Sequence, residues 1–212
     1  MDNVSSGKDK VSKSIRALLN FLLDKEFISE EDAVYLKKPL KLMKSNPDVW
    51  VPSTDSVQHV INNCLDPDCL LFFKLLLYSG IRVTEAHRIF ENFNKKKMHI
   101  VESIAYYDID WTRGKKKSNK AFMPKELAQN MRHMEVDPEQ LRKSFYRKQF
   151  ALKYCRKFFV NFCSKEGVPD SVIEYMIGHS GGSTLAINYL HKHQRAIDWY
   201  SKISPKLQNI IG

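Results

Sequence analysis

The chain has 212 residues, of which 43% are hydrophobic, and its formal net charge is +10 at pH 7. This length and hydrophobic content allow one large domain with an additional arm and exclude wholesale disorder. The positive charge favours a polyanionic partner, most simply nucleic acid, over the alternative of a basic protein without such a partner.

Nothing in the sequence indicates export or a membrane. The opening stretch MDNVSSGKDK is polar and charged, so we expect no signal peptide there. The longest apolar run, Cys69–Leu77, is far too short to cross a bilayer. No cysteine belongs to a CxxC pair, which predicts reduced thiols in the core of a cytoplasmic protein: Cys64, Cys69, Cys155 and Cys163.

The N-terminal quarter reads as an arm. Residues 1–10 are expected to form a disordered lead. From Val11 to Leu23 the apolar residues follow helical spacing, and Ser29 can cap a second short helix. A stretch rich in lysine and proline then predicts a linker. Two helices are too few for a domain of their own, so residues 11–45 are expected to be the last part of a helical domain, or an arm, followed by a linker.

Residues 50–212 are predicted to form the main domain. A capped helix follows Ser53, and the next segment, from Pro67, is apolar nearly all round and predicts the central buried helix. Gly80 is expected to end that helix as its C-cap. A further helix is expected from about Val83 to Phe90.

Residues 98–123 are rich in β-branched and aromatic side chains, which predicts a small sheet with a lysine-rich hairpin tip. From Pro124 the chain is expected to be helical again. One long helix, or two broken helices, should end at Gly167. A short helix, a glycine-rich turn and a final helix capped by Ser183 or Thr184 and running to Ile203 complete the prediction. The expected fold class is mainly α with a small antiparallel β-sheet (α+β).

Several side chains in this chain suit chemistry on a phosphate diester. Two arginines can hold the non-bridging oxygens through forked hydrogen bonds, a lysine can protonate the leaving 5′ oxygen, and a tyrosine can attack phosphorus. No acidic trio indicates a magnesium site, so we expect no metal ion and no cofactor, and the cations would stabilise the transition state. The candidates are Arg82, the hairpin lysines Lys115–Lys117 and Lys120, Lys153 with Arg156, His179, and Tyr189.

The order of these residues resembles that of the tyrosine recombinases. YSGIRVTEA, which contains Arg82 and Glu85, resembles the first arginine motif of that family. GHSGGSTLAINYLH is similar to its final motif, a histidine in a turn followed by the nucleophilic tyrosine. The resemblance covers about residues 50–195 and implies the catalytic-domain fold of that family there. Residues 11–45 resemble the last helices of its core-binding domain.

One residue departs from the usual family pattern. Lys153 stands where the family has a histidine, and a lysine titrates at much higher pH than histidine. This pattern, with Tyr189 ten residues after His179, most resembles integrases of archaeal viruses and plasmids, such as those of spindle-shaped viruses. In the hairpin, KSNK resembles the Lys-Gly-Asn-Lys turn of the family, which implies that Lys117 is the general acid. Lys116 is the alternative.

The resemblance implies a site-specific recombinase that cleaves and rejoins DNA through a 3′-phosphotyrosine. The catalytic set would be Arg82, Lys117, Lys153, Arg156, His179 and, as nucleophile, Tyr189. The implied partners are double-stranded DNA at attachment sites, a Holliday junction, and three further copies in a homo-tetramer on host DNA. Two alternatives stay open: a type IB topoisomerase, which uses the same chemistry, and a DNA-binding protein without chemistry.

Overall fold

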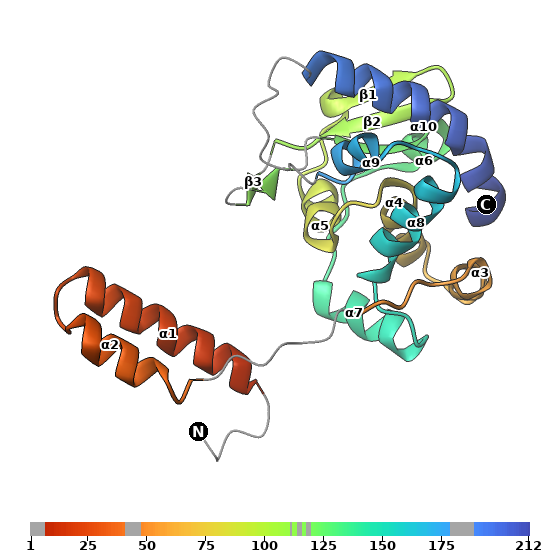
Figure 1. The fold of residues 1–212 in the computed structure, drawn as a ribbon. Coiled ribbons are helices and arrows are strands. Elements are labelled where there is room, and N and C mark those ends of the chain that lie inside the picture. Colours follow the sequence, from red (N-terminus) through yellow and green to blue (C-terminus); the bar gives the residue numbers. More distant parts are fainter. Residues whose placement is uncertain (1–6, 41–47, 111, 114–115, 118–119, 179–188) are drawn as a thin grey trace. The chain divides into compact units, whose positions relative to one another are not determined.

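A computed structural model of the chain describes residues 7–40, 48–110, 112–113, 116–117, 120–178 and 189–212 (Figure 1). The chain divides into two compact units, Met1–Val49 and Trp50–Gly212.

The first unit is a pair of helices, α1 (Lys8–Asp24) and α2 (Glu30–Lys37). Ser29 caps α2 as predicted, because its Oγ accepts a hydrogen bond of 3.1 Å from the amide of Asp32. The disordered lead predicted for residues 1–10 is wrong for residues 8–10, which are helical. Lysine and aspartate can occupy helical positions at little cost, so the charged residues at this point in the chain did not reveal that the helix had already begun. Residues 1–6 lie outside the described ranges.

The second unit begins with three helices around a buried centre. They are α3 (Thr54–Asn62), α4 (Pro67–Ser79) and α5 (Val83–Glu91). Asp66 caps α4 through hydrogen bonds from two backbone amides, and Pro67 occupies its first turn. As predicted, α4 is the central buried helix. The side chains of Phe72, Phe73, Leu75, Leu76 and Leu77 are all fully buried.

The sheet has three antiparallel strands in the order β1 (Met98–Val101), β2 (Ile104–Asp108) and β5 (Lys120–Pro124). A 3-10 turn, Lys95–Lys97, precedes β1. Between β2 and β5 the chain forms a two-residue ladder of β3 (Thr112–Arg113) with β4 (Lys116–Lys117). The predicted small sheet is therefore confirmed. Of the predicted lysine-rich hairpin tip, this short ladder is described, and residues 114–115 and 118–119 lie outside the described ranges.

The remaining helices are α6 (Lys125–Asn130), α7 (Pro138–Arg147), α8 (Tyr154–Lys165), α9 (Asp170–Met176) and α10 (Tyr189–Ile211). Of the two alternatives for the segment ending at Gly167, the broken pair is correct. Gln149 has φ of +57°, which interrupts the helical path between α7 and α8. The final helix continues through Pro205 to Ile211, beyond its predicted end at Ile203. Its predicted caps, Ser183 and Thr184, lie outside the described residues.

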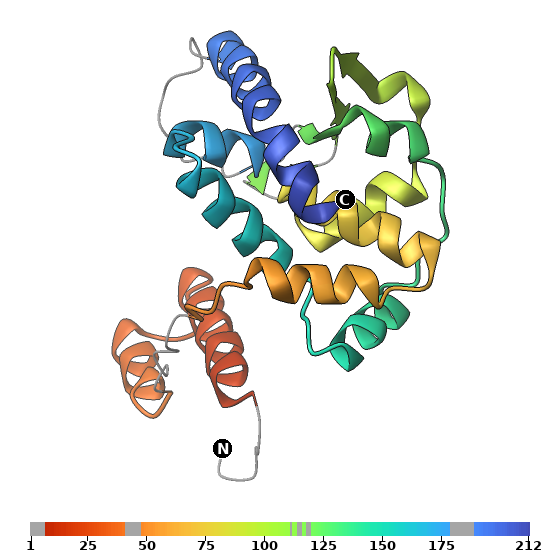
Figure 2. The same ribbon diagram turned by 90° about the vertical axis from the view of Figure 1, so that its right-hand side faces the viewer.

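These elements pack in layers around α4. It contacts α8 and α5 as well as β5 of the sheet, while α10 packs along α9, α3 and the sheet (Figure 2). The fold class, mainly α with a small antiparallel sheet, is confirmed.

Gly80 shows how tightly the end of α4 is packed. It has φ of +62°, and a Cβ at this position would lie 2.4 Å from Cδ1 of the buried Phe159. For Gly80→Ala we expect a loss of roughly 2–5 kcal/mol in the free energy of unfolding, from left-handed backbone strain and overpacking. Urea unfolding followed by circular dichroism measures it.

Gly167 is the matched control. It is also left-handed, with φ of +76°, but a Cβ there would meet nothing within 4 Å. Gly167→Ala should therefore lose only the backbone contribution, about 1–2 kcal/mol. Equal losses at the two positions would contradict the packing argument.

Candidate active site

Arg82 stands at the junction of α4 and α5, as the N-cap residue of α5. Glu85, one turn later, binds it twice. Its Oε2 accepts a hydrogen bond of 2.7 Å from the Arg82 amide, and its Oε1 accepts one of 2.6 Å from Arg82 Nη1. The Glu85 side chain is only 5% exposed, against 25% for Arg82. A buried carboxylate thus orients a guanidinium that is still partly open to solvent.

Arg156, in the first turn of α8, reaches the ends of two other helices. Its Nη1 donates to the carbonyl of Gly80 at 3.0 Å and to the carbonyl of Ile177 at 2.7 Å. Gly80 ends α4 and Ile177 ends α9. Arg156 therefore joins the start of α8 to the ends of α4 and α9. The two residues whose carbonyls it binds, Gly80 and Ile177, lie two positions before Arg82 and His179, respectively.

The two arginines are electrostatically coupled. Burial, followed by the positive charge of Arg82, lowers the pKa of Arg156 to about 10, while Glu85 opposes the shift. The Arg156 guanidinium still remains protonated at neutral pH. Two like charges held together with a single buried carboxylate favour the binding of an anion, because an anion would relieve their repulsion.

Lys153 precedes α8 and is exposed, one turn before Arg156. Its Nζ lies 4.7 Å from the centre of the Tyr154 ring. The structure thus places Lys153 and Arg156 at the same end of one helix. Tyr154 in turn contacts Trp50, with ring centres 4.4 Å apart, so the first residue of the second unit is packed against this helix end.

The other predicted site residues are described only in part. Lys116 and Lys117 form β4, paired with Arg113 and Thr112, and their side chains lie outside the description. His179 also lies outside it. Tyr189 is the first residue of α10, and its side chain is likewise not described. Of the predicted site, the described residues therefore place Arg82 near Arg156, and Lys153 at the same end of α8 as Arg156.

The second half of α10 is anchored in the core. Tyr200 is fully buried, and its hydroxyl donates to the carbonyl of Tyr78 at 2.9 Å. Burial raises the pKa of Tyr200 well above its usual value, and a hydroxyl enclosed in the core is not placed to reach a DNA phosphate. Further along, Gln58 Nε2 donates to the carbonyl of Ile210 at 3.4 Å, and Lys206 pairs with Glu166.

A cluster of polar and aromatic side chains that no sequence pattern indicated lies between α10 and the sheet. The ring of His99 stacks on Tyr106 at 4.8 Å, and His193 of α10 meets Tyr106 edge-on at 4.9 Å. Asp108 accepts a hydrogen bond from Lys120 and pairs with His99. Burial, followed by the charge of Lys120, lowers the pKa of His193. No motif indicated this cluster, because it depends on strand register.

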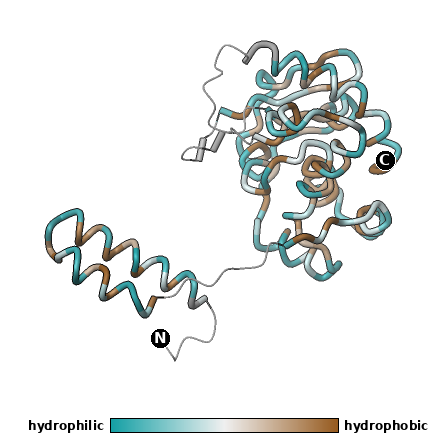
Figure 3. Tube along the Cα trace, in the orientation of Figure 1, coloured by the Kyte–Doolittle hydropathy of each residue, from teal (hydrophilic) through white to brown (hydrophobic). Residues whose placement is uncertain are grey.

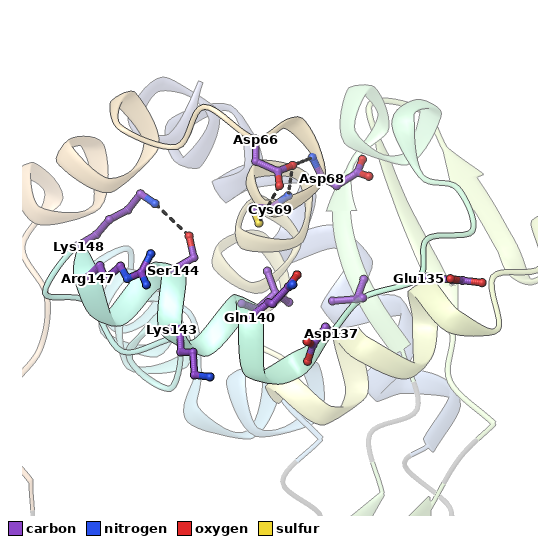
Figure 4. Close-up of a pocket in the computed structure, with 12 residues that line it drawn as sticks. Asp66, Asp68, Cys69, Glu135, Asp137, Gln140, Lys143, Ser144, Arg147 and Lys148 are labelled. Carbon is purple, nitrogen blue, oxygen red and sulfur yellow. Dashed lines mark hydrogen bonds between the residues drawn. The ribbon is translucent and has the colours of Figure 1, made fainter.

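A pocket of about 580 Å³ lies between the start of α4 and α7 (Figure 4). Asp66 and Asp68 line one side, and Lys143, Arg147 and Lys148 line another. Several of its polar groups serve the fold, since Asp66 caps α4 and Lys148 Nζ donates to Ser144 Oγ at 3.2 Å. Its lining includes none of the predicted catalytic residues, so we assign it no catalytic role.

A comparison with known protein families matches most of the second unit. None of the curated proteins matches the chain. No helix in the described ranges combines the length and apolar character needed to cross a membrane. A family model described as archaeal phage integrase matches residues 49–206, which include Arg82, Arg156 and Tyr189. The chain therefore belongs to the archaeal phage integrase family.

Proposed function

We propose that this integrase is a tyrosine recombinase that cuts and rejoins DNA through a 3′-phosphotyrosine. The observation that carries the proposal is the coupled pair of Arg82 and Arg156, fixed by Glu85 and by two backbone carbonyls. Such a pair fits a phosphate diester, whose two non-bridging oxygens accept hydrogen bonds from planar guanidiniums. The family match extends over both arginines and the proposed nucleophile.

In the proposed reaction the Tyr189 oxygen attacks phosphorus and releases its proton to solvent, while the bond from phosphorus to the 5′ oxygen breaks. Lys117 gives a proton to that oxygen, so a free 5′ hydroxyl leaves. Lys153 and His179 are proposed as further donors at the phosphate. The phosphotyrosine ester keeps the energy of the diester bond, so the reverse attack by a 5′ hydroxyl reseals DNA without ATP or a metal ion. The proposed assembly is a homo-tetramer that exchanges strands through a Holliday junction.

A trapping experiment tests this function. The full chain is incubated with a pool of duplexes of random sequence, each nicked once. Cleavage near the nick releases a short strand that diffuses away, so the covalent intermediate cannot be resealed. Protein-bound strands that survive detergent are then sequenced. We expect a discrete set of related sites. DNA binding without any covalent adduct in the pool would leave only the non-catalytic alternative.

The assignment of the general acid gives a separate prediction. Lys117→Ala should slow cleavage of an ordinary phosphate on the order of 10²–10⁴-fold, because the 5′ oxygen then leaves without a proton. The same variant should cleave a 5′-bridging phosphorothiolate at nearly the normal rate, because sulfur leaves without protonation. Single-turnover rates on the two substrates provide the measurement.

Lys116→Ala is the matched control in the same two-residue strand. It should affect both substrates mildly and equally. If the sulfur substrate rescues Lys116→Ala instead, the acid is Lys116. If it rescues neither variant, the general acid lies outside this strand.

A further inference from the structure

His193 extends the buried side of α10 towards the start of the helix. Buried residues recur along this side at intervals of three or four, namely Ala196, Tyr200, Ile203, Leu207 and Ile211. His193 lies three residues before Ala196 and so belongs to the same side. Figure 3 shows the alternation of hydrophobic and hydrophilic segments that this arrangement gives along α10. Tyr189 begins the helix four residues before His193, so a contact that holds His193 also holds the turn that carries the proposed nucleophile.

The ring of His193 rests on three aromatic rings. It meets the ring of Tyr106 edge-on, with centres 4.9 Å apart, and its centre lies 6.3 Å from those of Phe122 and Tyr175. Tyr106 and Phe122 are register partners in β2 and β5, and Tyr175 belongs to α9. The start of α10 is therefore docked on the sheet and on a neighbouring helix through one imidazole.

The surroundings of this ring suit a neutral imidazole better than a charged one. Nδ1 of His193 is buried, and among the described residues it has no hydrogen-bond partner. A protonated ring donates from both of its nitrogens. Protonation would therefore leave a charged N–H group buried without an acceptor, which costs more than leaving a neutral ring nitrogen unpaired.

Neighbouring charges act in the same direction as burial. Lys120 of β5 and, when protonated, His99 of β1 add positive charge near the ring, and Asp108 of β2 opposes them. Asp108 is already shared, because it accepts a hydrogen bond from Lys120 and pairs with His99. The phenols of the two tyrosines against the ring are uncharged at neutral and acid pH. Burial, followed by Lys120, thus lowers the pKa of His193.

The same cluster reaches the base of the lysine-bearing hairpin. Asp108 ends β2 and Lys120 begins β5, and these two residues are register partners on either side of the hairpin that contains β3 and β4. Lys120 Nζ lies 4.3 Å from the centre of the Tyr106 ring, which also touches His193. One tyrosine ring is therefore shared by the strand pair that leads to the proposed general acid and the helix that begins with the proposed nucleophile.

We propose that His193 is a positioning residue, which in its neutral form holds the start of α10 against the sheet and on taking up a proton releases it. The placement of Tyr189 for attack would then depend on pH. That consequence rests on the proposed function, whereas the docking of the helix does not.

The direction of the pH effect follows from the two states of the helix. In the released helix the imidazole is in water and has its ordinary pKa of about 6.5, whereas in the docked helix the pKa is lower. The released helix therefore binds the proton more readily. Docking is at full strength above about pH 6.5 and weakens as the pH falls below that value. The docking equilibrium changes by about tenfold at most for each pH unit.

Hydrogen exchange of the full chain without DNA tests the docking. Exchange at the amides of residues 193–197 is measured at about pH 7.5 and about pH 5.5 and corrected for the intrinsic pH dependence of amide exchange. In the unaltered chain these amides should be protected at neutral pH and should exchange severalfold, up to about tenfold, faster in acid. The amides of the anchored half, from Tyr200 onward, should keep their protection and serve as the internal reference.

Neutral side chains at position 193 should remove the response to acid. His193→Phe keeps an aromatic ring that cannot take up a proton, and His193→Leu provides a smaller neutral side chain, so both should stay protected at both pH values. His133→Phe is the matched control, because His133 is exposed and lies outside the cluster, and this variant should respond as the unaltered chain does. His99→Gln should also keep the response. Unprotected amides at neutral pH in the unaltered chain or in both neutral variants would overturn the proposal, as would a response that persists in them or disappears in His99→Gln.

Cleavage in the trapping experiment gives the second readout. The single-turnover rate of His193→Phe, divided by that of the unaltered chain, should rise severalfold, up to about tenfold, between about pH 7.5 and about pH 5.5. Other titrating groups, His179 among them, are common to both chains and cancel in this ratio. A purely structural loss would give the same ratio at both pH values and would contradict the positioning role. If neither chain forms an adduct, the proposed function fails, and hydrogen exchange alone decides the docking.

Discussion

Replacing Tyr189 with phenylalanine should abolish the covalent DNA adduct while leaving DNA binding close to normal. The substitution removes only the hydroxyl that would attack phosphorus, and phenylalanine keeps the ring at the start of α10. Without a nucleophile no ester can form, so the expected effect is complete loss rather than a slower reaction. The trapping experiment with nicked duplexes, read on a denaturing gel, measures the adduct, and a gel-shift titration measures affinity.

Tyr146→Phe is the matched control for this substitution. Tyr146 lies in α7 and is 76% exposed, so losing its hydroxyl should change neither adduct yield nor affinity. An adduct of normal yield from Tyr189→Phe would show that another residue is the nucleophile. Tyr200 would not be that residue, because its hydroxyl is buried and bound to the carbonyl of Tyr78.

The second large effect concerns the arginine pair. Arg82→Lys should slow single-turnover cleavage on the order of 10²–10³-fold, about 2.7–4 kcal/mol, as expected when one donor to a developing oxyanion is removed. Lysine keeps the positive charge but lacks the planar fork that can contact Glu85 and a phosphate oxygen together. A rate near that of the unaltered chain would contradict the bidentate model.

Arg156→Lys should show a comparable loss of rate together with a loss of stability. Arg156 also satisfies the carbonyls of Gly80 and Ile177, which a lysine cannot reach in the same geometry. Comparing the melting temperatures of the two variants therefore separates the two roles. Arg142→Lys is the control, since Arg142 is an exposed residue of α7 that pairs with Glu139, and its replacement should leave both quantities unchanged.

The lowered pKa of Arg156 has a consequence for DNA binding. Below pH about 10 the folded protein holds this guanidinium charged at a cost, because burial and Arg82 both disfavour the charge. That cost is full at neutral pH, decreases once the pH passes about 10, and is gone when the pH reaches the ordinary arginine pKa. A bound phosphate would offset this unfavourable electrostatic energy at neutral pH. Part of the binding free energy would therefore come from neutralising charges that already repel each other in the free protein.

Local patterns predicted most of the fold. Ser53, Asp66 and Gly80 mark the ends of helices through their own side chains or backbone freedom, so the sequence around them is sufficient. The break at Gln149 was harder to predict, because a left-handed glutamine carries no clear signal and both alternatives fitted the pattern. The helical state of residues 8–10 was missed because polarity was taken as a sign of disorder.

The site was only partly predictable. Motif order was enough to single out Arg82 and Arg156 as candidates. It did not reveal that Arg156 binds the carbonyl of a residue 76 positions earlier, since such a contact depends on how α4, α8 and α9 meet in space. The sequence did not predict the cluster of His99, Tyr106 and His193 for the same reason. Periodicity predicts that strands exist, but the register that places these rings together comes from packing.

The anchored half of α10 determines what subunits of an assembly could share. Tyr200 and Leu207 are fully buried, and Tyr200 fills space between Phe122 and Phe159. Withdrawing them would leave a void in the core of the donor, at a cost of about 3–5 kcal/mol for an aromatic ring alone. A neighbour could therefore receive at most the part of the helix before this anchor. The C-terminal half of α10 stays packed in its own subunit. In an assembly of unaltered and Tyr189→Phe chains, the number of nucleophilic tyrosines would therefore equal the number of unaltered chains.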